Sequence, residues 1–95
     1  MKKKKIVYVP MAVDILHSGH LNIIEVARKL GDVVIGLLAD EAIVNYKRLP
    51  MLSFEERKRI VENIKGVKSI IVQETYDYEP MLKKLKPDFV VHGDD

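Results

Sequence analysis

Four short apolar runs divide the chain, and they constrain its fold more than any other feature. They are rich in β-branched residues and occupy residues 6–9, 33–38, 69–72 and 89–92. Continuous apolar runs, rather than strict alternation, are typical of strands covered on both faces, as in parallel sheets. Stretches with helical spacing separate the runs, and strands that alternate with helices are joined by right-handed crossovers. The sequence therefore predicts a three-layer α/β/α fold with a four-stranded parallel sheet in the order 3-2-1-4.

Start and stop signals mark the helices between these strands. Gly31 follows the first helical stretch as a C-terminal stop. Asp40 is expected to cap the second, and Ser53 with Glu56 three residues later forms a capping box for the third. The apolar positions of the first helix run from residue 21 to residue 30, and the other three helices are predicted at residues 40–46, 53–64 and 81–85.

Composition limits the chain to a few classes of protein. Its 95 residues, 47% of them hydrophobic, support one core and hence a single domain over residues 1–95. The net charge is +2, and acidic and basic residues are interspersed along the chain. This pattern does not indicate binding to nucleic acid or to a membrane surface. There is no cysteine, so disulfides and thiolate metal sites are excluded. No apolar run approaches the roughly 20 residues that span a bilayer, and a cytoplasmic protein is expected.

The motif His17-Ser18-Gly19-His20 follows the first strand and opens the first helix. The N–H groups of a first helical turn and the helix dipole favour an anion there, and Gly19 lets a phosphate approach the backbone. His17 and His20 lie on one side of the turn and can donate to phosphate oxygens. Fixed donors of this kind suit nucleotidyl transfer, in which negative charge builds on the phosphates. Two histidines without a role, or a metal pair, are the alternatives, although no third metal ligand is near.

Further candidates lie in the loops that follow the strands. Asp14 can orient a histidine, contact a nucleotide or simply cap the next turn. Lys47 and Arg57 can neutralise a triphosphate or an anionic acceptor, or can lie on a solvated face. Gly93 and Asp94 follow the fourth strand, which lies beside the first at the switch point of a 3-2-1-4 sheet. They suit a nucleotide sugar, a base edge or a Mg²⁺ shell, or form a plain turn.

The segment 14–20, the helix that carries Arg57 and the segment 93–95 resemble the cytidylyltransferase-like family of His-x-Gly-His nucleotidyltransferases. The resemblance covers essentially the whole chain and implies a Rossmann-like fold. Within the family, the chain is similar to glycerol-3-phosphate cytidylyltransferases. The segments 9–12 and 46–50 bring it closer to the cytidylyltransferase-like domains that accompany phosphoenolpyruvate phosphomutase.

The resemblance implies transfer of CMP from CTP, with Mg²⁺, to a phosphate or phosphonate oxygen of a small anionic acceptor, with release of pyrophosphate. It implies that His17 and His20 hold the phosphates and stabilise the transition state, and that no covalent enzyme intermediate forms. The other residues that it implies in nucleotide or phosphate binding are Met11, Asp14, Ser18, Gly19, Lys47, Arg57, Gly93 and Asp94.

The chain departs from the family pattern in three places. Val13 stands where phenylalanine is common, and Lys65 stands where many members carry arginine. The family also continues beyond its Gly-Asp-Asp with a further strand and a Ser/Thr-rich phosphate-gripping motif, whereas this sequence ends at Asp95. We therefore expect a domain without its last β-α unit, which opens apolar surface and favours a homodimer.

Three other functions stay open at this point. The chain can be a half-domain that binds nucleotide or phosphate without turnover. It can transfer an adenylyl group, since the histidine motif serves both bases. It can also be a structural fragment that folds only by pairing with a second copy.

Overall fold

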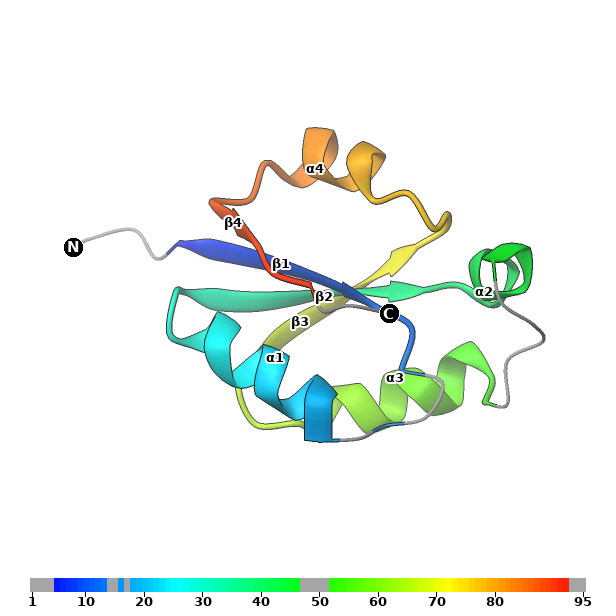
Figure 1. Cartoon of the computed structure of the whole chain (residues 1–95), viewed down its shortest axis with the longest axis horizontal. Helices are drawn as coiled ribbons and strands as arrows, with labels where there is room; N and C mark the ends of the chain where they lie inside the picture. The colour runs from blue at the N-terminus through cyan, green and yellow to red at the C-terminus, as the bar shows by residue number, and fades with distance from the viewer. Residues whose placement is uncertain (1–4, 14–15, 17, 47–51, 93–95) are drawn as a thin grey trace.

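The computed structural model describes residues 5–13, 16, 18–46 and 52–92. The elements are β1 (Ile6–Met11), α1 (Ser18–Arg28), β2 (Asp32–Leu38), α2 (Asp40–Tyr46), α3 (Phe54–Glu62), β3 (Val67–Gln73), α4 (Glu79–Leu85) and β4 (Phe89–Val90). The four strands form one parallel sheet in the order β3-β2-β1-β4 (Figure 1). The predicted fold class, element order and strand order are therefore confirmed. No helix in the described ranges has the length and apolar character needed to cross a bilayer.

The main core lies on the face of the sheet that α1 and α3 cover, while α4 lies on the opposite face (Figure 1). Alternate residues of β1 and β2 point into this core, and Ile24, Ala27 and Val61 reach it from the two helices. Both central strands are buried almost throughout. The continuous apolar runs thus gave the correct prediction for β1 and β2.

The outer strands are more exposed than their apolar runs predict. Val72 in β3 is 46% exposed, and Phe89 and Val90 in β4 are 38% and 37% exposed. Both strands lie at edges of the sheet, and the short helix α4 buries none of its residues. The prediction of burial on both faces is therefore wrong for β3 and β4. Val72 pairs with Leu37 and Phe89 pairs with Val7, and both partners point into the main core. Val72 and Phe89 are therefore exposed at the two edges of the face that α1 and α3 cover, whereas Val90 is exposed on the opposite face.

The helix starts follow the cap chemistry in one case and not in another. The Ser53 hydroxyl accepts from the Glu56 amide at 3.2 Å, and the Glu56 carboxylate accepts from the Ser53 amide at 2.9 Å, so the predicted capping box is confirmed. Asp40 does not cap α2, because the Ala39 carbonyl accepts the first backbone bonds of that helix. Helix α1 begins at Ser18, ahead of its first apolar position.

A buried polar pair joins β1 to β3 across β2. The Tyr8 hydroxyl donates to Gln73 Oε1 at 2.6 Å, and both residues are almost fully buried. Burial raises the pKa of Tyr8 from its ordinary value of 10.0 to about 12, so the phenol remains a neutral donor in alkaline solution as well as at physiological pH. The ring lies directly over Gly36 of β2, where a Cβ would overlap the Tyr8 hydroxyl and ring carbons. The sheet therefore cannot hold both a side chain at position 36 and the Tyr8 ring, so β2 needs glycine at position 36.

Candidate functional site

β1 and β4 are parallel neighbours whose carboxyl ends point to the same edge of the sheet, and they define its switch point. β4 pairs with β1 on the side opposite to β2, with Phe89 beside Val7 and Val90 beside Tyr8. The Val91 amide then donates to the Tyr8 carbonyl at 3.0 Å, which keeps the chain beside β1 after the strand. Ligands of open α/β sheets bind at the carboxyl edge where the winding direction reverses. The candidate site therefore lies where β1 leads into α1.

Helix α1 begins at this edge with the second part of the histidine motif. Ser18 is exposed, and Gly19 and His20 are half-buried in the first turn. The first turn carries no acidic residue, and the only basic residue in the last turn is Arg28. The positive end of the helix dipole at Ser18 therefore has no neighbouring carboxylate in its own turn to offset it, which favours a bound anion.

The chain leaves β1 through a residue in a rare backbone conformation. Val13 has a φ of 55°, in the left-handed region, and is 1% exposed. A β-branched residue there is strained by an amount on the order of 1–3 kcal/mol, and such residues persist only where their surroundings hold them. Strain of this kind is concentrated at functional sites. Sequence reasoning noticed Val13 only as a departure from phenylalanine and missed its conformation.

Met11 and Arg57 lie in places that the sequence reasoning did not foresee. Met11 is 6% exposed and belongs to the main core, so little of its surface can meet a nucleotide. Arg57 is 0% exposed, and its guanidinium is bonded to backbone carbonyls and to Asp40. Direct contact of Arg57 with a triphosphate or acceptor does not fit this placement. The reason is helical spacing, since Arg57 lies three residues after Phe54 and four before Val61 on the face of α3 that turns to the sheet.

The remaining predicted residues lie outside the described part of the chain, and their contribution stays a prediction. These residues are Asp14, His17, Lys47, Gly93 and Asp94. The last described residue is His92, which follows β4 and whose ring centroid lies 5.7 Å from that of Tyr78. The carboxyl end of β4 is therefore packed against the start of α4.

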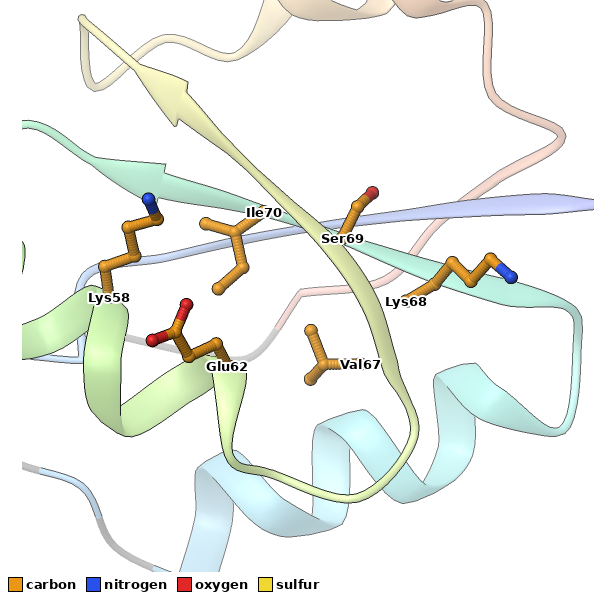
Figure 2. Close-up of a pocket in the computed structure, with 6 residues that line it drawn as sticks. All are labelled: Lys58, Glu62, Val67, Lys68, Ser69 and Ile70. Carbon is orange, nitrogen blue, oxygen red and sulfur yellow. The ribbon is translucent and has the colours of Figure 1, made fainter.

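A hollow of about 200 Å³ lies elsewhere, between α3 and the beginning of β3 (Figure 2). Lys58 and Glu62 line it from α3, and the first residues of β3 line the other side. It is therefore at the amino end of β3, whereas ligands of this kind of sheet bind beyond the carboxyl ends of the strands. Its charged groups have both signs, which gives no preference for an anion. We place the candidate site at the start of α1 and not in this hollow.

Comparisons with known proteins extend this picture. Residues 12–95 match the family model described as Cytidylyltransferase-like. FAD synthase from Archaeoglobus fulgidus is 40% identical over 82 residues, which are 86% of this chain and 60% of that protein. Ethanolamine-phosphate cytidylyltransferase from Arabidopsis thaliana is 37% identical over 101 residues, which cover 99% of this chain and 24% of that protein.

A solved structure shares the fold over most of the chain. It is the lipopolysaccharide core biosynthesis protein from Thermoplasma volcanium GSS1, with a TM-score of 0.84 and 26% identity, covering 93% of this chain and 73% of that one. The chain spans just over half the length of the FAD synthases that it matches, 54% for Ferroglobus placidus and 60% for Archaeoglobus fulgidus. Because the family match runs from residue 12 to residue 95, the chain belongs to the cytidylyltransferase-like family.

Proposed function

We propose that this nucleotidyltransferase-type domain transfers CMP from CTP to a phosphate or phosphonate oxygen of a small anionic acceptor and releases pyrophosphate. The observation that carries the proposal is the glycine-containing start of α1, which follows β1 at the switch point of the sheet. Similarity to an ethanolamine-phosphate cytidylyltransferase supports the cytidylyl group and a phosphate acceptor.

The reaction is a displacement at the α-phosphorus of the nucleotide. An acceptor oxygen forms the new P–O bond while the bond to pyrophosphate breaks, and pyrophosphate leaves with the electron pair. Negative charge grows on the α-phosphate oxygens and on the leaving group. The positive end of α1, His20 in its first turn and His17 are the groups that we assign to stabilise this charge. No covalent enzyme intermediate is required.

Mg²⁺ enters the proposal together with the nucleotide. The described residues offer no group of three or more His, Asp or Glu side chains that could hold a metal ion. Mg²⁺ is commonly held by substrate phosphates with one or two carboxylates rather than by a dedicated protein cage. We therefore assign the ion to the phosphates of the bound nucleotide, whose charge it offsets, and we derive no step through it.

Adenylyl transfer is the second candidate. FAD synthases from two archaea are 38% and 40% identical to this chain. FAD carries an adenylyl group joined to a flavin phosphate, so its formation uses the same phosphorus chemistry with another base. The phosphate-binding elements described above suit either nucleotide, because the start of α1 recognises phosphate and not the base.

A release assay separates these functions. The purified chain is incubated with Mg²⁺ and either CTP or ATP, and pyrophosphate is measured with ethanolamine phosphate, glycerol 3-phosphate or FMN as acceptor. We expect release with CTP and a small phosphate acceptor, and we expect His20→Ala to lower kcat by about 10²–10³. Asn22→Ala, at an exposed position on the same helix, is the matched control and should leave kcat unchanged.

Each other outcome decides against the first candidate. Release with ATP and FMN alone would assign adenylyl transfer. No release under any condition, together with saturable nucleotide binding, would make the chain a binding module and would contradict the proposed reaction.

We also propose that two copies of the chain associate. Phe89 and Val90 are more than one third exposed on β4, an edge strand, and Tyr76 before α4 is 54% exposed. Unpaired edges and open apolar surface of this kind are commonly covered by another chain. Sedimentation velocity at micromolar concentration should show a dimer, which Val90→Lys should dissociate. A single monomer peak for the unmodified chain would contradict this expectation.

A further inference from the structure

Arg57 is the most unusual residue in the described structure because its full charge is buried. The guanidinium donates from Nη1 to the Ala12 carbonyl at 2.9 Å and to the Leu38 carbonyl at 2.6 Å. From Nη2 it donates to Asp40 Oδ1 at 2.6 Å, and from Nε to the Leu52 carbonyl at 3.3 Å. One side chain of α3 therefore joins the ends of β1 and β2, the start of α2 and the residue before the cap of its own helix.

Stability alone is a poor reason for this arrangement. Burying a charge is costly, and an apolar side chain of similar volume often stabilises such a position equally well or better. Within the described part of the chain, the one ionic partner of Arg57 is Asp40, whose side chain is 42% exposed, and Arg57 has a cation–π contact with the Phe54 ring at 5.6 Å. The planar guanidinium does what an apolar group cannot, since its fixed donors hold several carbonyl groups at defined positions.

The bond to Ala12 lies next to the strained residue of the site. The Ala12 carbonyl belongs to the peptide group that precedes Val13, whose φ is 55°. Left-handed backbone at a β-branched residue needs surrounding contacts to hold it. Arg57 supplies one such contact at the carbonyl, and the core supplies another at the buried Val13 side chain. Together they fix the direction in which the chain leaves β1 toward α1.

We infer that Arg57 is a positioning residue for the phosphate turn and not a ligand of the nucleotide. Together with Asp40 it holds the carboxyl ends of β1 and β2, so that the backbone at Ala12 and Val13 leaves β1 in a fixed direction toward the first turn of α1. The nucleotide named in this inference comes from the proposed function, on which the inference therefore rests. The backbone order that it predicts does not depend on any ligand.

The test compares Arg57→Lys, which keeps the charge but loses the planar set of donors, with Arg59→Lys at an exposed position of the same helix. Hydrogen exchange of the free protein is measured well below the unfolding temperature. We expect Arg57→Lys to speed amide exchange within residues 12–20 by about tenfold while β3 keeps its protection. Titration with CTP and ATP should show affinity weakened about tenfold, because the less ordered backbone must be fixed when the phosphate binds. Arg59→Lys should change neither.

A second pair of variants separates geometry from charge. Asp40→Asn keeps an acceptor oxygen for Arg57 and should preserve most of the slow exchange in residues 12–20, whereas Asp40→Ala should not. Uniformly faster exchange in Arg57→Lys would indicate a general loss of stability and would overturn the inference. Weaker affinity with unchanged exchange would mean that Arg57 contacts the ligand, which would also overturn it. If the unmodified chain binds neither nucleotide, the proposed function fails, and the exchange measurement still decides the positioning role.

Discussion

Gly36→Ala is expected to lower the free energy of unfolding by about 3 kcal/mol or more, because overpacking in a rigid interior has nowhere to relax. The new Cβ would overlap the Tyr8 hydroxyl and ring. Neither side of this clash can move easily. Gly36 is paired with Pro10 of β1 and Ile71 of β3 in the middle of the sheet, and the Tyr8 hydroxyl is bonded to Gln73. Urea unfolding followed by circular dichroism measures the effect.

The control removes the other side of the clash. In a Tyr8→Leu background the hydroxyl and outer ring atoms are gone, so adding Gly36→Ala should lower the free energy of unfolding by less than about 1 kcal/mol. The difference between this effect and the effect of Gly36→Ala in the unmodified chain measures the coupling between the two positions. If Gly36→Ala alone does not fold, recovery of cooperative unfolding in the double variant gives the same answer. If Gly36→Ala lowers the free energy of unfolding equally in the unmodified chain and in the Tyr8→Leu variant, the described packing of Tyr8 over Gly36 is contradicted.

The largest functional effect is expected from replacing both histidines of the motif. His20 lies in the first turn of α1, and the sequence places His17 just before that helix. A hydrogen bond to a charged group contributes about 1.5–3 kcal/mol, so losing two weakens nucleotide binding by about 10²–10⁴. Fold stability should change little, since His20 is half-buried and belongs to neither core cluster. The double variant should therefore remain folded and lose its affinity.

The regular part of the fold could be predicted from local sequence. The runs that form β1 and β2 are apolar throughout because those strands are central, and the Ser53 capping box uses residues only three apart. The start of α1 could be predicted only from the histidine motif, because its first turn is polar and carries no apolar periodicity. Exposure of β3 and β4 depends on their place at the edges of the sheet and on how far the helices of both faces reach over them, which are tertiary properties that no local pattern contains.

The candidate site shows the same division. The order of strand, glycine and histidines is local, so the start of α1 could be predicted as a phosphate site from adjacent residues. The position of Arg57 could not, because its partners Ala12 and Leu38 are 45 and 19 residues away and take part through backbone carbonyls. Because every residue has a backbone carbonyl, residue type does not show which carbonyls accept these bonds. The only local signal was that Arg57 shares helical spacing with Phe54 and Val61, which places a charge on an apolar face.

The central claim is that the start of α1 is a working nucleotide-phosphate site, and calorimetric titration tests it most directly. CTP and then ATP, each with Mg²⁺, are titrated into the unmodified chain, into His17→Ala/His20→Ala and into the Asn22→Ala control. We expect saturable binding that the double variant loses and the control retains, with circular dichroism showing that all three are folded. Absence of binding to the folded unmodified chain, or equal binding to the double variant, would contradict the claim.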